Sequence, residues 1–597
     1  MSRHSARAER SATRTTTRTR LDLLIGDRRR MIVALAGFSL LAGFSEAATL
    51  ALIAQLAYGV VKGGSHLHTN IGPFSIHASI GTLLEIAFGV CIIRILLVVP
   101  VSVLPARIAT SVQAGLRTRI FDAYTRSSWR VQSTDREGQL QETMTNQVMQ
   151  ATMAALMMTS LITTGIMFVV LTLSAFALNV LAAVVVLAVS FSGFAILAPM
   201  RRRLRSRAGE MSEAQVNYAG GIAEAVSVAQ EIHVFGADAA QRTRIDGFVQ
   251  RTREITYRTQ LLMRLAPALY QAMIYLLLIG GLAALEAIGR GHAGALGGVV
   301  LLMVRAGSTG QSVQTAYQGL VQALPFIERT QNAEQRYRAD APRAGGLPLP
   351  RIKALAFERV SFAYREGVPA LQDISFAVAG NETIGIVGPS GAGKSTLVQL
   401  LLRLREPQDG HYLVNGTPAE EFARRDWQAR VSYVPQEPRL IHASVADNIR
   451  FFRDLDAQAI ERGARLARIH DVVMSWRDGY ETIVGPRAAA VSGGQQQRIC
   501  LARALAGSPE VLILDEPTSA LDPQSEKAIS ASLTSLSHEL TLFIVAHRMS
   551  TLDMCDRVMV IIDGRLVAFD TKALLERENS YYRVASELAG TSGAGAA

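Results

Sequence analysis

The stretch "GPSGAGKST", Gly388 to Thr396, fits the pattern G-x-x-x-x-G-K-[ST] of a phosphate-binding loop. It follows the apolar, β-branched "TIGIV" and opens the helix-prone "STLVQLLLRL", the strand–loop–helix context that the pattern requires. Glycines let backbone N–H groups point at phosphate oxygens, so we expect Lys394 to reach the β- and γ-phosphates and Ser395 to ligate Mg²⁺. The residues expected to hold the nucleotide here are Gly388, Pro389, Ser390, Gly391, Ala392, Gly393, Lys394, Ser395 and Thr396.

A second stretch, "VLILDE", supplies the acidic groups that such a loop needs. Its apolar residues predict a buried strand whose end presents Asp515 to the magnesium ion. Glu516 is then placed to polarise an attacking water as a general base. Alone, an apolar run ending in Asp-Glu is more often a strand meeting a solvent-exposed loop. Downstream of a phosphate-binding loop in the same domain, the catalytic interpretation is favoured.

The first half of the chain has a different character. Of the 597 residues 49% are hydrophobic, mean hydropathy is +0.21, and the apolar residues are concentrated before about residue 310. A membrane-crossing helix needs roughly 20 apolar residues. Six stretches meet or approach that length: 31–61, 83–105, 156–176, 180–199, 265–288 and 293–306. The sequence therefore predicts a six-span membrane domain, with the last span continuing beyond the membrane.

The basic residues set the orientation of these spans. The net charge is +11, and much of it lies in the N-terminal tail and in "MRRRLRSR", both beside apolar spans. That placement follows the positive-inside rule and argues against nucleic acid as a partner. The long polar segments 107–150 and 201–264 are thus predicted to be cytoplasmic, as are both termini. Three scattered cysteines, Cys91, Cys500 and Cys555, indicate neither a disulfide framework nor a metal site.

The domain organisation follows from these patterns. We expect a basic cytoplasmic arm at 1–30 and a transmembrane domain at 31–334. The Pro- and Gly-rich "QRYRADAPRAGGLPLPRIK" marks a linker at 335–353. Beyond it short strands alternate with helices, which predicts an α/β nucleotide-binding domain at 354–597. The expected fold class is an α-helical six-span transmembrane domain followed by an α/β P-loop ATPase domain.

Five further short motifs surround the phosphate-binding loop in a fixed order. They are "VSFAY" with Tyr364, "YVPQEP" with Gln436, "VSGGQ" at 491–495, "SALD" with Asp522, and "VAHRMS" with His547. Singly each is weak, since such residues more often serve packing, a surface position or a local hydrogen bond. Together, over about residues 355–570, they make this half resemble the nucleotide-binding domain of ABC transporters.

The resemblance assigns roles to these residues. It implies that Tyr364 stacks on adenine and that Gln436 senses magnesium and contacts the membrane domain. His547 is the expected contact to the γ-phosphate. The expected catalytic set is Lys394, Gln436, Glu516 and His547, and the expected magnesium ligands are Ser395, Gln436 and Asp515. ATP and Mg²⁺ are therefore the predicted cofactors of an ATP hydrolase coupled to transport.

The glycine turn of "VSGGQ" lacks a lysine, so it does not complete a nucleotide site alone. In the family this turn faces the phosphate-binding loop of a second domain, and two ATP molecules lie in the interface. The resemblance thus implies that Ser492, Gly493, Gly494 and Gln495 hold the partner's γ-phosphate, and that the loop of Asp522 crosses to the opposite subunit. With one such domain per chain, dimerisation is required. A homodimer is expected, and a heterodimer with a related chain remains open.

Six spans fused ahead of one ATPase domain resemble exporter-type half-transporters. The resemblance implies short coupling helices near 127–136 and 226–234, although both stretches also fit ordinary surface helices. One departure lies in "GPRAAAV", where Pro486 stands at the position of a glutamate that contacts the coupling loops. ATP binding is not affected by this change, but that coupling contact is placed in doubt. Val491 replaces the family's leucine within apolar chemistry.

The substrate is the least defined part of this interpretation. Arg94 and Arg305 fall within predicted spans, and Glu46 interrupts the first one. Charges within a membrane usually face a cavity or pair with one another. We hypothesise that the two arginines line a translocation cavity for an amphipathic anion. The alternative is an internal pair with Glu46 or, for Arg305, an interfacial position.

The leading function is export or flipping of an amphipathic or lipid-like compound. The alternatives are an importer with the exporter fold, for example for a siderophore, and an ATP-gated channel or regulator. The intact Glu516 disfavours a gate, which needs no turnover. The expected partners are a second copy, membrane lipid and the transported molecule. The expected location is a bacterial inner or plasma membrane with the ATPase domain in the cytoplasm, and an organelle remains open.

Overall fold

The computed structural model divides the chain into two compact units, Met1–Ala341 and Pro342–Ala597. Each unit is described separately. The structure describes residues 26–584 except 63–65, 72–73, 136–137, 179–183, 185–186, 189–191, 193–194, 197, 288–292, 341–344, 366, 487, 489–490, 518–522 and 547.

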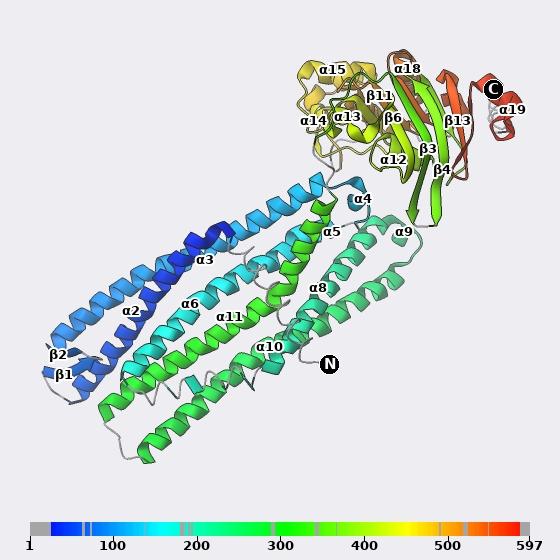
Figure 1. The fold of residues 1–597 in the computed structure, drawn as a ribbon. Helices are drawn as coiled ribbons and strands as arrows, with labels where there is room; N and C mark the ends of the chain where they lie inside the picture. Colours follow the sequence, from blue (N-terminus) through cyan, green and yellow to red (C-terminus); the bar gives the residue numbers. More distant parts are fainter. Residues whose placement is uncertain are drawn as a thin grey trace. The chain divides into compact units, whose positions relative to one another are not determined.

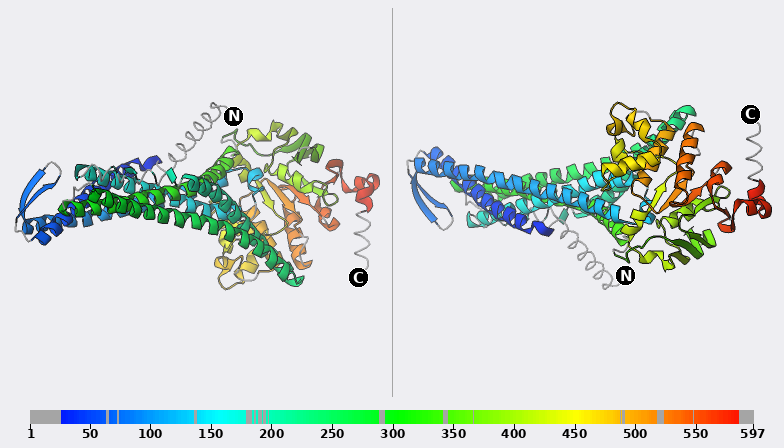
Figure 2. Two further views of the ribbon diagram at one scale, coloured as in Figure 1. Left: turned by 90° about the horizontal axis from the view of Figure 1, so that it is seen from below. Right: turned by 90° about the horizontal axis from the view of Figure 1, so that it is seen from above.

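The first unit is a bundle of long helices. They are α2 (Arg29–Lys62), α3 (Ile80–Arg126), α6 (Val148–Leu178), α8 (Ala198–Ser227), α10 (Asp238–Ala287) and α11 (Ala293–Ala339). In Figure 1 and in both views of Figure 2 these helices run alongside one another. The helix α11 packs against α6 along much of its length and also contacts α2, α3, α8 and α10. It is therefore the helix around which the bundle is built.

Short elements join the long helices at the two ends of the bundle. One end carries a hairpin of β1 (His66–Ile71) and β2 (Phe74–Ser79). The other end carries the short helices α4 (Trp129–Gln132) and α9 (Ala229–Val234), as Figure 1 shows. The remaining short elements are η1 (Gly26–Arg28), α5 (Gln139–Glu142) and the π-helical η2 (Thr143–Gln147).

The membrane spans are longer helices than hydropathy alone predicts. Among the described residues, three helical segments are long and apolar enough to cross a membrane: Arg29–Ala57, Ile80–Arg126 and Gln139–Phe176. They contain the second and third predicted spans and most of the first. The fourth, 180–199, falls mostly outside the described residues. The fifth and sixth lie in α10 and α11, whose many polar residues extend far beyond the apolar stretch.

The second unit is built on a six-stranded sheet in the order β14-β13-β5-β12-β11-β8. Its strands are β5 (Thr383–Val387), β8 (Val431–Val434), β11 (Val511–Asp515), β12 (Thr541–Val545), β13 (Arg557–Ile562) and β14 (Arg565–Asp570). All neighbours are parallel except β14, which is antiparallel to β13. The strands "TIGIV" and "VLILD" of the sequence are β5 and β11. The predicted fold class is confirmed.

Two smaller sheets complete this unit. An antiparallel sheet has the order β4-β3-β6-β7, and β9 pairs with β10. Their strands are β3 (Ala354–Arg365), β4 (Val368–Ala379), β6 (Asp409–Val414), β7 (Thr417–Pro418), β9 (Ala443–Ser444) and β10 (Ile483–Val484). The helices are α12 (Lys394–Leu401), α13 (Arg424–Arg430), α14 (Val445–Arg450), α15 (Ala457–Leu466), α16 (His470–Met474), α17 (Gly493–Leu505), α18 (Pro523–Leu536) and α19 (Lys572–Glu578). Three 3₁₀ turns are η3 (Ala419–Glu421), η4 (Gly479–Glu481) and η5 (Met549–Met554).

The central sheet is buried on both faces, because alternate residues of its strands enter different hydrophobic cores. Ile513 packs on the side of α12 and the antiparallel sheet, while its neighbours Leu512 and Leu514 pack on the side of α17 and α18. Burial on both faces explains why these strands are continuous apolar runs. Parallel strands also place their carboxyl ends at one edge. The loops after β5, β8, β11 and β12 therefore meet there.

Candidate functional site

The phosphate-binding loop connects β5 to the N-terminus of α12. Gly391 and Gly393 have φ angles of 82° and 103°, which disfavour any residue with a Cβ. The Lys394 Nζ donates hydrogen bonds to the carbonyl oxygens of Gly388, at 2.8 Å, and Pro389, at 3.0 Å. The lysine thus lies folded over its own loop. Burial lowers the pKa of Lys394, while the carboxylates of Glu516 and Asp515 oppose that shift.

The two acidic residues lie at the same edge of the sheet, Asp515 as the last residue of β11 and Glu516 directly after it. The Gln436 side chain, in the loop after β8, donates to a Glu516 carboxylate oxygen at 2.8 Å. The Tyr433 hydroxyl donates to Asp515 at 3.4 Å, and burial together with the Asp515 charge raises the pKa of Tyr433. Glu516 has a φ of 47°, a strained conformation for a residue with a side chain. The fold thus brings Lys394, Gln436, Asp515 and Glu516 together.

Tyr364 lies beside α12, where an adenine ring is expected. Its hydroxyl is 3.2 Å from the Thr396 hydroxyl oxygen, and its ring is half exposed. The Arg405 guanidinium stacks over this ring, 4.9 Å from the centroid. Sequence reasoning missed Arg405, because an isolated arginine after a helix carries no motif. Asp522 and His547 lie outside the described residues, so their predicted roles remain predictions.

The "VSGGQ" turn forms the N-terminus of α17. Ser492 caps the helix: its hydroxyl accepts from the Gln495 N–H at 3.3 Å, and the Gln495 side chain accepts from the Ser492 N–H at 2.9 Å. This reciprocal capping box fixes the helix N-terminus. Ser492 and Gly493 are exposed, whereas Gly494 is buried. A Cβ added at Gly493 would meet nothing within 4 Å. The turn is therefore an open, rigid helix N-terminus of the kind that binds anions.

Contacts within the unit connect this helix to the Gln436 loop. The buried Gln497 of α17 donates to the carbonyl oxygen of Pro435 at 3.5 Å. Pro486, which departs from the family pattern, contacts a residue of the segment between β8 and β9: its carbonyl oxygen lies 3.1 Å from the His442 Nδ1. A Cβ at the preceding Gly485 would lie 2.4 Å from the Ile441 carbonyl oxygen. Sequence reasoning missed Gln497 and His442, since both connect segments far apart in the chain.

The short helices α4 and α9 lie where coupling segments are expected. α4 is fixed to the end of α11: Ser128 and Arg130 both hydrogen-bond Asp340. The Arg130 and Ser128 hydrogen bonds lower the pKa of Asp340. The Tyr337 hydroxyl donates to Asp135 at 2.6 Å, and burial, reinforced by Asp135, raises the pKa of Tyr337 to about 12. These contacts make α4 and the end of α11 one structural element.

The charges of the predicted spans meet inside the first unit. The Glu46 carboxylate, on α2, pairs with Arg305 of α11 and with Arg94 of α3, whose Nη2 is 3.5 Å away. Only 2% of the Glu46 side chain is exposed. Arg305 also lines a pocket between α6 and α11. Arg94 is not among the described residues lining that pocket. Arg305 therefore both lines a pocket and pairs with Glu46, and its role in a translocation cavity for an anion stays a prediction.

A helical membrane unit followed on the same chain by a P-loop domain with a second anion-binding helix N-terminus defines a membrane transporter with an attached ATPase. Comparison with known proteins identifies the family. Residues 32–289 match the model of the ABC transporter transmembrane region, and residues 371–519 match the model described as ABC transporter. The chain belongs to the ABC transporters. Both domains lie on one chain, which is the organisation of an exporter-type half-transporter.

Individual relatives support this assignment. The ATP-dependent lipid A-core flippase of Cupriavidus metallidurans is 32% identical over 419 residues, which cover 68% of this chain and 69% of the flippase. ATP-binding cassette sub-family B member 6 of Mus musculus is 38% identical over 244 residues, or 40% of this chain, but the match spans only 29% of that longer relative. A bacterial Atm1-family ABC exporter structure with ATP bound has a TM-score of 0.78 at 22% identity, covering 94% of this chain and 98% of that one. That structure supports the fold.

Proposed function

We propose that this chain is an ATP-driven exporter or flippase of an amphipathic or lipid-like substrate, and that it works as a dimer with two ATP sites. One observation carries the proposal. The chain holds two separate helix N-termini suited to binding phosphate, one with Lys394 and the other with exposed Ser492 and Gly493. The P-loop supplies a lysine that the "VSGGQ" turn lacks, and the turn supplies a second, exposed helix N-terminus. This favours sites composed of one P-loop and the partner's "VSGGQ" turn.

The proposed site extends to the residues gathered at the edge of the sheet. ATP would lie on the loop Gly388–Thr396 with its adenine on Tyr364. Ser395, Asp515 and Gln436 have the hydroxyl, carboxylate and carboxamide oxygens that suit Mg²⁺. The bound ion would offset the negative charge of the phosphates. Glu516 would orient and deprotonate the attacking water, and Gln436, already hydrogen-bonded to it, would fix its position.

The substrate class rests on two kinds of support. The lipid A-core flippases among the relatives act on a lipid, as their name states. The pocket between α6 and α11 is lined mostly by polar side chains, with two methionines, and lies in the helical unit. By the positive-inside rule the ATPase unit would lie in the cytoplasm. A bacterial inner membrane is the proposed location, in keeping with the bacterial relatives.

The composite sites can be tested by mixing two inactive variants. Lys394→Ala destroys the P-loop, and Ser492→Arg blocks the turn with a large cation. Each homodimer lacks both sites, but a mixed dimer regains one intact composite site. Co-purified mixed dimers in lipid should hydrolyse ATP at about half the wild-type rate or less, while each variant alone stays near zero. No recovery in verified mixed dimers would contradict the proposal. Fluorescent-lipid translocation in vesicles, with Glu516→Gln as control, tests transport and its direction.

A further inference from the structure

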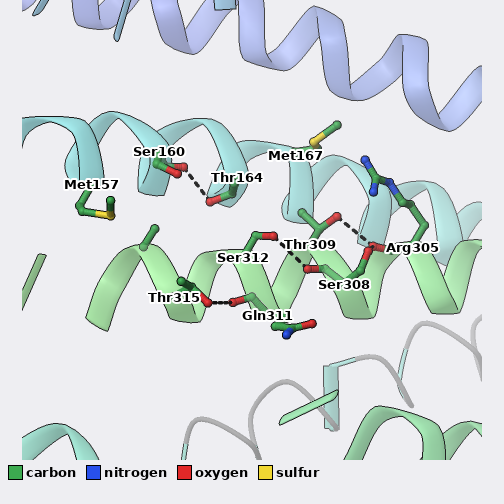
Figure 3. Close-up of a pocket in the computed structure, with 11 residues that line it drawn as sticks. Met157, Ser160, Thr164, Met167, Arg305, Ser308, Thr309, Gln311, Ser312 and Thr315 are labelled. Atoms are coloured by element: carbon green, nitrogen blue, oxygen red, sulfur yellow. Dashed lines mark hydrogen bonds between the residues drawn. The ribbon is translucent and has the colours of Figure 1, made fainter. Parts of the chain in front are cut away.

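The pocket between α6 and α11 has a volume of about 610 Å³ and an unusual chemical character. Figure 3 shows hydroxyl side chains from both helices around it, with the Arg305 side chain extending from α11 toward α6. Its hydroxyl-bearing lining residues are Ser160, Thr164, Ser308, Thr309, Ser312 and Thr315. Met157 and Met167 add apolar, adaptable surface.

Most of these hydroxyls donate to their own helix. Thr164 donates to the Ser160 carbonyl oxygen at 2.7 Å, and Thr309 donates to that of Arg305 at 2.9 Å. Ser312 and Thr315 do the same one turn back along α11. A hydroxyl whose proton is used in this way still offers oxygen lone pairs. The pocket therefore presents hydrogen-bond acceptors to a ligand, with Arg305 as the cationic donor. A ligand that carries hydroxyl groups beside a negative charge matches both features.

The charge beside this pocket is unbalanced. Glu46 pairs with two arginines, Arg94 and Arg305, so the three side chains sum to one excess positive charge. The carboxylate is almost fully buried, and its Oε2 has no hydrogen-bond donor among the described residues. An uncompensated charge among membrane helices is costly. One negative charge beside Arg305 would balance the cluster.

We propose that Glu46 is an internal stand-in for the anionic group of the substrate. The substrate is a hydroxylated anionic amphiphile whose charged group binds the Arg305 guanidinium in this pocket, in competition with the Glu46 carboxylate. Its hydroxyl groups donate to the Ser and Thr oxygens. The strength of the Glu46–Arg305 pair thereby sets how strongly an anion must bind in order to replace Glu46 as the partner of Arg305. This inference rests on the proposed transport function and names the substrate class of that transporter.

The test compares two lysolipids with the same acyl chain. Lysophosphatidylglycerol is anionic and carries hydroxyl groups, whereas lysophosphatidylcholine is zwitterionic. Their dissociation constants are measured on the full-length protein in nanodiscs without nucleotide, so the readout does not depend on turnover. Wild-type protein should prefer the anionic lipid. Equal affinity for the two lipids would overturn the proposal.

Charge variants then separate this role from a structural one. Glu46→Gln removes the competing anion and should tighten lysophosphatidylglycerol binding by roughly tenfold or more, since neighbouring unit charges interact strongly at low dielectric. Arg305→Gln should weaken it by a similar factor. Neither substitution should change the dissociation constant of lysophosphatidylcholine by more than about twofold. Glu85→Gln, the same substitution at an exposed position of α3, is the matched control.

The outcomes distinguish the two levels of the proposal. If both variants change the affinities for the two lipids by the same factor, or leave both affinities unchanged, Glu46 and Arg305 have a structural role and the inference fails. Arg305→Gln leaves the Glu46–Arg94 pair in place, so it remains informative if Glu46→Gln does not fold. If mixed dimers hydrolyse ATP and move lipid without an anionic preference, only this inference fails. If they do neither, the proposed function fails.

Discussion

Replacing Gly388 by alanine should strongly lower ATP turnover, because the structure leaves no room for a methyl group there. A Cβ at this position would lie 2.0 Å from the Ile561 carbonyl oxygen on β13 and 3.1 Å from its carbonyl carbon. The obstacle is backbone inside the central sheet, so no side chain can move away. The loop itself must therefore shift by more than 1 Å to restore an ordinary contact.

That shift reaches the catalytic groups directly. The Gly388 carbonyl oxygen accepts a hydrogen bond from Lys394, so the lysine and the phosphate-binding N–H groups would move with the loop. A misplacement of about 1 Å in a catalytic arrangement costs on the order of 100-fold in rate. We expect Gly388→Ala to lower ATP turnover by about 100-fold or more, measured as phosphate release in lipid nanodiscs. Binding of a fluorescent ATP analogue should weaken in parallel.

Gly416→Ala is the matched control within the same unit. Gly416 lies between β6 and β7 with a φ of 83°, and an added Cβ would meet nothing within 4 Å. The substitution costs about 1–2 kcal/mol of backbone strain without moving the P-loop. Turnover should stay within about twofold of wild type. If Gly388→Ala retained more than a tenth of wild-type turnover while Gly416→Ala behaved as expected, the steric reasoning would be refuted.

Three further perturbations test other parts of the structure. Tyr337→Phe removes the hydroxyl that donates to Asp135 at 2.6 Å but keeps the ring, so it should cost about 1–2 kcal/mol of stability, seen as a lower thermal midpoint. Gln436→Ala should raise the Mg²⁺ concentration for half-maximal turnover by roughly tenfold. The lowered pKa of Asp340 means that its contact with Arg130 stabilises the protein above the unfolded pKa and is lost as pH falls. The stability difference between wild type and Asp340→Asn should therefore shrink below about pH 3.8, the ordinary pKa of an aspartate.

The α/β fold could be predicted because its signals are local. The runs "TIGIV" and "VLILD" are buried on both faces, so burial shows directly as continuous apolar sequence. The hydropathy of the first half marks the spans but not the full length of their helices. It marks only the part of a helix that contacts lipid, whereas α10 and α11 continue for many polar residues. The sequence of the β1–β2 hairpin held a signal that was not used, the stretch "HLHTNI" followed by a Gly-Pro pair.

The site residues divide along the same line. Lys394 and Glu516 belong to short motifs, so their positions could be named from sequence. The contacts within the site join segments far apart in the chain: Gln436 to Glu516, Gln497 to Pro435, and Arg405 to Tyr364. Such pairs depend on the order of strands in the sheet, and no local pattern contains that order. The same is true of Glu46, whose partners lie on two other helices.

The two candidate ligand sites share a physical principle. In each, the cationic side chain is held by an internal oxygen acceptor: Lys394 by the carbonyls of its own loop, and Arg305 by Glu46. A cation at such a site is costly without an anionic or polar partner. A ligand at either site therefore exchanges partners with the protein, and its gain is the difference between two sets of contacts. Selectivity then depends on the internal acceptor as much as on the cation. For Lys394 the acceptors are neutral carbonyls, which a triphosphate readily outcompetes. For Arg305 the acceptor is a full carboxylate, so only a strongly anionic group displaces it.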